Sequence, residues 1–182
     1  MRPRARTGDT VYAARIDRAR ADAHPAPKGV YNHSGVTEMT LIHATCVAID
    51  GAGVLLRGPS GAGKSDLALR LIDEGAVLVA DDYCHVTVAD GRLIATAPAA
   101  IAGKMEVRGQ GIIAMPIAAD ATIAVVIDLM PAKDIARLPD STTCVLDGVT
   151  VPHVCIDAAA PSAAARVRLA VRTATHSDKI NS

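Results

Sequence analysis

Short apolar runs separated by turn residues dominate the chain from residue 41 onward, a pattern typical of an α/β domain with a mixed sheet. Three Asp-Gly pairs, at 50–51, 90–91 and 147–148, stand between successive runs and predict tight hairpins. Strands are predicted over residues 41–49, 54–57, 76–80, 85–88, 92–97, 122–130, 143–146 and 149–156.

Apolar residues at helical spacing predict a helix from about Gly63 to Glu74. Gly75 stands at its C-cap position, where glycine commonly ends a helix. A second, alanine-rich helix is predicted over 158–175, and a short one over 131–137. The exposed positions of the alanine-rich helix are expected to hold Arg166, Arg168 and Arg172.

The segment Gly58-Pro59-Ser60-Gly61-Ala62-Gly63-Lys64-Ser65 matches G-x-x-x-x-G-K-S, the phosphate-binding loop of nucleotide-binding proteins. A β-prone run precedes it and a helix follows, as the motif requires. Its glycines let backbone N–H groups approach an anion, and the start of the helix adds a positive dipole end. We expect Lys64 to reach the β- and γ-phosphates of ATP and Ser65 to ligate Mg²⁺. A glycine-rich turn without a ligand is the weaker interpretation.

Two adjacent carboxylates, Asp81 and Asp82, follow the apolar run 76–80. At the end of a buried strand near a phosphate loop, one could hold Mg²⁺ directly or through water. The other could accept a proton from an attacking hydroxyl. The alternative is a solvated turn that begins with aspartate.

Composition excludes several classes of function. The 182 residues include no Phe, no Trp and three Tyr, which argues against a base-stacking nucleic-acid surface. The formal net charge is zero, so no overall field favours nucleic acid or an anionic membrane. The scattered cysteines have no C-x-x-C spacing, which argues against zinc and favours reduced thiols in a cytoplasmic protein.

The ends of the chain differ from its middle. Residues 1–38 are rich in Arg and Pro and predict a disordered extension. A single domain is predicted over 39–175, followed by a flexible tail at 176–182. Within the domain, residues 104–113 combine Glu106 and Arg108 with two glycines, which predicts a mobile loop that handles anions.

The order and spacing of these motifs resemble the catalytic domain of HPr kinase/phosphorylase, over roughly Leu41 to Thr173. That family has a His at the end of its first strand, then G-x-S-G-x-G-K-S, V-A-D-D and a signature like E-[IV]-R-G-x-G-I-I. A looser D-R-L-G segment follows. The matching segments here are His43, 58–65, 79–82, 106–113 and 135–138.

The resemblance implies a P-loop fold with a core like that of phosphoenolpyruvate carboxykinase. It also implies a cytoplasmic enzyme that uses ATP and Mg²⁺ to phosphorylate a serine of an HPr-type phosphocarrier protein. That reaction regulates carbon and nitrogen metabolism through the phosphotransferase system. By the resemblance, Lys64 binds the transferring phosphoryl group, and Ser65 and Glu106 ligate Mg²⁺. Asp82 takes the serine proton, His43 supports that transfer, and Arg137 stabilises charge on the phosphoryl group.

Some segments depart from the family pattern. Asp66 replaces the usual Glu, and residues 114–117 replace a glycine-rich segment. Residues 157–161 stand where the long forms carry arginines tied to the reverse, phosphorylase reaction. The kinase direction is therefore the expected one. The family forms hexamers, but the altered loops leave homo-oligomerisation open. The alternatives are a P-loop kinase of a small metabolite and a non-enzymatic nucleotide-sensing module.

Overall fold

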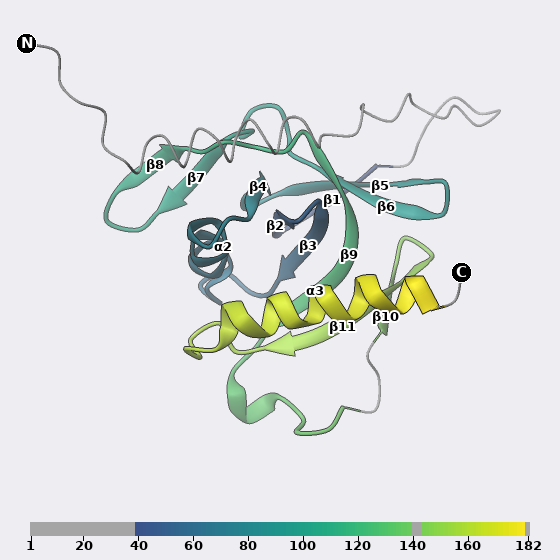
Figure 1. The fold of residues 1–182 in the computed structure, drawn as a ribbon. Coiled ribbons are helices and arrows are strands. Elements are labelled where there is room, and N and C mark those ends of the chain that lie inside the picture. Colours follow the sequence, from purple (N-terminus) through teal and green to yellow (C-terminus); the bar gives the residue numbers. More distant parts are fainter. Residues whose placement is uncertain (1–38, 140–142, 181–182) are drawn as a thin grey trace, which may run out of the picture.

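A computed structural model describes residues 39–139 and 143–180, and the predicted extension at 1–38 lies outside them. These residues form a mixed sheet with two main helices, the predicted fold class (Figure 1). The elements are β1 (Met39–Ile42), β2 (Ala44–Ile49), β3 (Ala52–Arg57), α2 (Lys64–Asp73), β4 (Val77–Ala80), β5 (Cys84–Ala89), β6 (Arg92–Thr96), β7 (Lys104–Val107), β8 (Gly111–Ala114), β9 (Asp120–Leu129), η1 (Ala132–Asp134), β10 (Thr143–Leu146), β11 (Val149–Ile156) and α3 (Ala163–Ile180).

The main sheet curls on itself. Its strand order is β1-β5-β6-β9-β3-β2-β4, and β10 and β11 pair with each other, with β11 joined to β9. One residue, His43, links β1 to β2, and such a link spans only about 7 Å. Because β1 and β2 lie near opposite ends of the strand order, the sheet must bend until these ends meet. The prediction of a single strand over 41–49 is therefore wrong, since the chain changes partners at His43.

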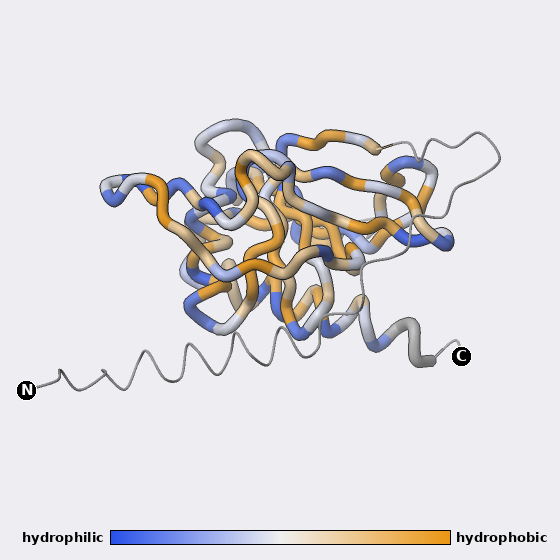
Figure 2. Tube along the Cα trace, turned by 90° about the horizontal axis from the view of Figure 1, so that it is seen from above, coloured by the Kyte–Doolittle hydropathy of each residue, from blue (hydrophilic) through white to orange (hydrophobic). Residues whose placement is uncertain are grey.

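The curl creates two cores. On its outer face, α2 and α3 pack on apolar residues of β2, β3, β9 and β11, such as Leu56 and Ile127. On its inner face, a second cluster includes Cys46, Leu55 and Val126. Alternate residues of one strand thus enter different cores, which explains the near-continuous apolar runs in the sequence. Figure 2 shows these apolar stretches inside the body and hydrophilic residues at the hairpin tips.

The predicted hairpins form at all three Asp-Gly pairs. Asp50 and Gly51 have φ angles of 50° and 82°, and the other two pairs are also left-handed. This geometry matches the two-residue turns that suit the twist of antiparallel strands. The parallel pairs β3–β9 and β9–β11 complete the mixed sheet.

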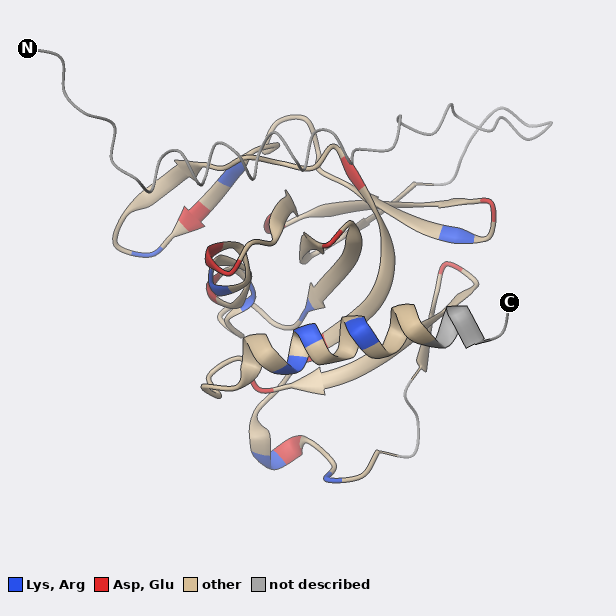
Figure 3. Cartoon of the chain, in the orientation of Figure 1, with Lys and Arg blue, Asp and Glu red and all other residues tan. Residues whose placement is uncertain are grey.

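The end of α2 is fixed by two devices. Gly75, at φ 105°, donates to the carbonyl of Ile72, and Ala76 donates to that of Leu71, which is the Schellman arrangement. In addition, the Arg168 guanidinium pairs with Glu74 and bonds the Glu74 carbonyl. The prediction that Arg168 is exposed is therefore wrong, although Arg166 and Arg172 are exposed as predicted, and Figure 3 shows basic positions along the described part of α3.

Three further predictions need correction. Residues 104–113 are not a mobile loop but mostly the β7–β8 hairpin, anchored by the buried side chain of Met105. The helix predicted over 131–137 is only the 3₁₀ turn η1. The helix predicted over 158–175 begins at Ala163, after the turn at Pro161, and continues to Ile180.

Candidate active site

The glycine-rich segment 58–65 connects β3 to α2, as its motif requires. Gly63 stands at the N-cap of α2 in the left-handed conformation, φ 89°. Lys64 is the first helical residue and is 6% exposed. Its Nζ donates to the carbonyl oxygens of Gly58 (3.0 Å) and Pro59 (3.2 Å), so the ammonium lies under the curve of the loop.

Close packing explains why two of these positions require glycine. A Cβ on Gly58 would lie 3.1 Å from the Leu129 carbonyl oxygen, and one on Gly63 would lie 3.0 Å from the Ala158 Cβ. Both glycines also have positive φ angles, which other residues adopt at a cost. The end of β9 and the turn after β11 therefore pack closely against the loop.

Asp81 accepts three hydrogen bonds beside the loop. It is 4% exposed, and its Oδ1 accepts hydrogen bonds from Ser65 Oγ and Thr45 Oγ1, both at 2.8 Å. Its Oδ2 accepts the backbone N–H of Glu106 at 3.4 Å. The β7–β8 hairpin is thus joined to the phosphate loop through one buried carboxylate.

Asp82 belongs to a different group of residues. Its Oδ1 lies 3.1 Å from His43 Nε2, and the His43 ring packs beside Tyr83 at 5.5 Å between centroids. The Asp82 side chain is 67% exposed, and the residue has the left-handed φ of 66°. The Asp82 carbonyl also accepts the N–H of Ala44 at 3.1 Å, which ties this pair to the seam where the sheet closes.

A third polar group lies at the same end of the sheet. Arg57 makes two 2.8 Å hydrogen bonds to the two oxygens of Asp128, and His153 Nε2 lies 2.8 Å from Asp128 Oδ2. Arg57 is the strand partner of both Asp128 and Ala44, the residue after His43. Burial raises the pKa of Asp128, but the hydrogen bonds and charges of Arg57 and then His153 outweigh this effect, so the pKa lies below its usual value of 3.8.

The Arg57–Asp128 ion pair therefore makes the stability of the fold depend on pH. Because the pKa of Asp128 is depressed in the folded protein, its stabilisation is present at neutral pH and is lost as pH falls through that lowered pKa. We expect Asp128→Asn to reduce the free energy of unfolding at pH 7 by about 1 kcal/mol, since partial exposure screens the pair. Urea unfolding at pH 7 and pH 3 measures this, and the difference from wild type should shrink at pH 3. The exposed turn variant Asp90→Asn is the control, and an equal loss at both pH values would contradict the linkage.

The structure brings most of the predicted site residues together. His43 and Asp82 are in contact, and Lys64 lies under the phosphate loop. Ser65, through its hydroxyl, and Glu106, through its backbone N–H, both bond Asp81. Arg137 is exposed on the segment after η1 and makes no ion pair within the described residues. Its predicted contact with a phosphoryl group stays a prediction.

Sequence reasoning left Asp81 out of the final site and missed Thr45 and the Arg57–Asp128–His153 group. The V-A-D-D segment was a signal for Asp81, but the resemblance gave a role to Asp82 alone, and only the fold shows the contacts of Asp81. Nothing in the local sequence of Arg57 or His153 relates them to Asp128, because the three residues come from separate strands.

The residues around the loop fit a nucleotide with Mg²⁺. The Ser65 hydroxyl donates a hydrogen bond to Asp81, which leaves the oxygen lone pairs available to a cation. Glu106 carries an exposed carboxylate, the group that Mg²⁺ prefers, on the hairpin whose backbone bonds Asp81. The glycines and Lys64 supply the N–H groups and positive charge that phosphates require.

Comparison with known proteins gives a consistent result. A family model described as the HPr serine kinase C-terminal domain matches residues 34–175. The HPr kinase/phosphorylase of Clostridium tetani is 46% identical over 77 residues, 42% of this chain and 25% of that protein. That of Clostridium beijerinckii is 42% identical over 84 residues, 46% of this chain and 28% of that protein. The matched segments thus cover about a quarter of the length of these relatives.

A solved structure extends the similarity to most of the fold. The Hpr(Ser) kinase/phosphatase from Coxiella burnetii has a TM-score of 0.67 and 26% identity, over 79% of this chain and 99% of that chain. These similarities confirm the resemblance that the motifs predicted and the α/β fold class. Among residues 39–139 and 143–180, no helix has the length and apolar character to span a bilayer.

Proposed function

The chain belongs to the HPr serine kinase C-terminal domain family, and we propose that it transfers the γ-phosphoryl group of ATP to a serine of an HPr-type phosphocarrier protein. Mg²⁺ is the proposed cofactor. A cytoplasmic location is part of the proposal, because four unpaired cysteines suit a reducing compartment.

The observation that carries the proposal is the separation of the two adjacent aspartates. Asp81 is buried against Ser65, next to the expected phosphates, whereas Asp82 is two-thirds exposed and paired with His43. A protein hydroxyl can reach an exposed carboxylate but not a buried one. Asp82 is thus the candidate base, and Asp81 is the candidate organiser of the metal and the loop.

The mechanism follows from these positions. The loop N–H groups and Lys64 hold the β- and γ-phosphates, and the Lys64 ammonium neutralises charge that develops during transfer. Bound Mg²⁺ would neutralise phosphate charge, with Ser65 and Glu106 as ligands and Asp81 holding Ser65 in place. Asp82 accepts the serine proton as the hydroxyl oxygen bonds the γ-phosphorus in line, while the bond from that phosphorus to the β–γ bridging oxygen breaks and ADP leaves. His43 orients the Asp82 carboxylate through their contact and so supports the proton transfer.

A transfer assay tests the proposal and separates it from its rivals. The purified chain is incubated with γ-labelled ATP, Mg²⁺ and a purified HPr-type phosphocarrier, and the label is followed into phosphoserine. A phosphocarrier with its acceptor serine replaced by alanine is the control. Label that enters only small metabolites would favour a metabolite kinase. ATP binding without any transfer would favour a nucleotide-sensing module.

Glu106→Gln should weaken ATP binding in Mg²⁺ by about tenfold or more, because the amide cannot supply the negative oxygen expected at the metal. Titration calorimetry with and without Mg²⁺ measures the effect, and ATP binding without the metal should be nearly unchanged. Glu74→Gln is a control, because Glu74 pairs with Arg168 at the far end of α2. If Glu106→Gln keeps the full Mg²⁺ dependence, the ligand role moves to Asp81 or Asp82.

A further inference from the structure

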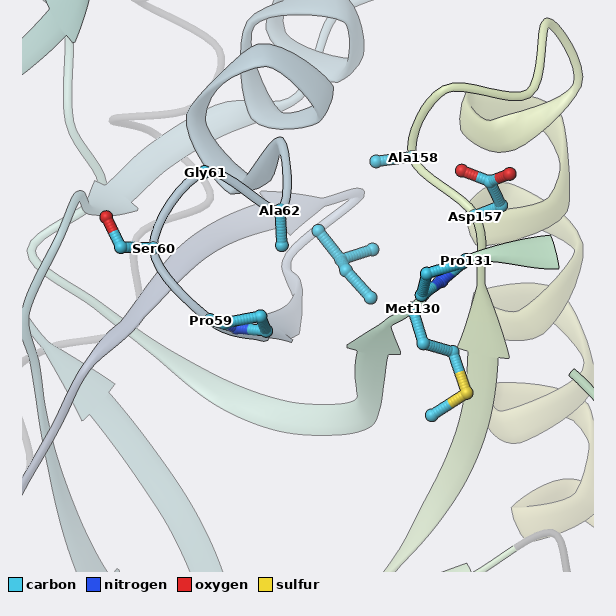
Figure 4. Close-up of a pocket in the computed structure, with 9 residues that line it drawn as sticks. Pro59, Ser60, Gly61, Ala62, Met130, Pro131, Asp157 and Ala158 are labelled. Atoms are coloured by element: carbon cyan, nitrogen blue, oxygen red, sulfur yellow. The ribbon is translucent and has the colours of Figure 1, made fainter. Parts of the chain in front are cut away.

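A pocket of about 370 Å³ opens beside the phosphate loop, and neither Asp82 nor His43 lines it. It lies between the loop, the end of β9 and the turn after β11, and Figure 4 shows the loop residues facing Met130, Pro131 and Asp157 across it. Its lining residues are Pro59, Ser60, Gly61, Ala62, Leu129, Met130, Pro131, Asp157 and Ala158.

We propose that this pocket holds the nucleoside half of the phosphoryl donor and that Asp157 accepts a hydrogen bond from a ribose hydroxyl. The inference rests on the proposed use of ATP and goes beyond it, because it assigns residues to a part of the donor that the phosphate-loop motif does not address.

Charge excludes phosphate from the pocket. None of the nine lining residues is basic, and the only charged one is the carboxylate of Asp157. A phosphate beside it would be repelled, whereas a hydroxyl group can donate to it. The apolar side chains of Leu129, Met130 and Pro131 suit an uncharged ring system.

The pocket shares residues 59–62 with the phosphate loop, and this shared wall indicates which ligand it takes. Residues 59–62 line the pocket and also form the curve that encloses the Lys64 ammonium. A ligand that occupies both places must be polyanionic at one end. Its other end must be uncharged, partly apolar and able to donate hydrogen bonds. A nucleoside triphosphate has this character.

The carboxylate of Asp157 is held in position before any ligand arrives. Its Oδ1 accepts the N–H of Ala159 at 2.9 Å, and its Oδ2 accepts that of Ala132 at 3.3 Å. Each oxygen keeps a lone pair for a further donor. Met130 donates to the Ile156 carbonyl at 3.1 Å, which joins the two strands that carry the pocket. A preorganised acceptor loses little entropy on binding.

Calorimetry with three ligands tests the proposal. ATP, 2′,3′-dideoxy-ATP and inorganic tripolyphosphate are titrated in Mg²⁺ into the wild-type chain. We expect ATP to bind about tenfold more tightly than the dideoxy analogue, as for one hydrogen bond to a charged group. Equal affinities of wild type for ATP and the dideoxy analogue would overturn the assignment without any variant.

Asp157→Ala should weaken ATP binding by about tenfold, remove the preference over the dideoxy analogue and leave tripolyphosphate binding unchanged. Asp157→Asn, which keeps the shape, should have a weaker effect of the same kind. Asp134→Ala is the matched control, because Asp134 is an exposed carboxylate on η1 outside the pocket lining.

Two results with Asp157→Ala would overturn the proposal. One is an equal loss of tripolyphosphate affinity, which would show that Asp157 only supports the loop. The other is a raised KM for the phosphocarrier with unchanged ATP affinity. If wild type bound no ATP, the proposed function itself would fail.

Discussion

Lys64→Ala is expected to reduce phosphoryl transfer by at least a thousandfold, which corresponds to about 4 kcal/mol of lost transition-state stabilisation. The Lys64 ammonium is buried under the phosphate loop and bonds the carbonyl oxygens of Gly58 and Pro59. In that place it meets the phosphates with little competition from water, so its charge acts at close range. The measurement is single-turnover transfer from labelled ATP to the phosphocarrier.

Two controls separate this effect from damage to the fold. The thermal unfolding midpoint of Lys64→Ala is measured first, because the substitution leaves two loop carbonyls without the ammonium. Arg70→Ala then removes another cation of α2, one that lies beyond the loop and pairs with Asp66 and the Ala158 carbonyl. We expect Arg70→Ala to lose stability more than transfer. If Lys64→Ala keeps a tenth of wild-type activity, a loss of only about 1.4 kcal/mol, the loop is not the phosphate site.

Local patterns in the sequence predicted most of the fold. The Asp-Gly pairs placed the hairpins, because their left-handed φ angles suit a two-residue turn and little else. Gly75 predicted the end of α2 for the same kind of reason. The break at His43 could not be predicted, because residues 41–49 are uniformly suited to a strand. Only the pairing of β1 with β5 and of β2 with β3 shows that the chain changes partners there.

The candidate site was predictable as far as its chemistry is encoded in one continuous segment. The phosphate loop identified Lys64 and Ser65 directly, and the family resemblance supplied His43, Asp82 and Glu106. Long-range contacts were not predictable in this way. Arg57, Asp128 and His153 lie on three strands whose side-by-side order depends on parallel pairing across the sheet. The Asp157 pocket likewise depends on how the turn after β11 meets the phosphate loop.

Asp82→Asn is expected to lower phosphoryl transfer by about 10²-fold or more while ATP affinity changes by no more than a few-fold. Asparagine keeps the size of the side chain and its contact distance to His43, but it cannot take a proton. A serine hydroxyl is almost entirely protonated at neutral pH, so the loss of a positioned base slows the attack. Nucleotide binding should persist, because Asp82 makes none of the contacts that join Asp81 to Ser65.

Two companion variants make the assignment specific. His43→Ala should lose less transfer than Asp82→Asn, because His43 acts through the Asp82 carboxylate at 3.1 Å. Asp81→Asn should instead weaken ATP binding in Mg²⁺, since the buried carboxylate accepts the Ser65 and Thr45 hydroxyls. The three variants are compared for turnover, ATP affinity and thermal unfolding. Normal transfer by Asp82→Asn together with lost transfer, at unchanged ATP affinity, by Asp81→Asn would mean that the base is Asp81. Normal transfer by both would remove the enzyme proposal, and the two carboxylates would then serve a nucleotide-binding module.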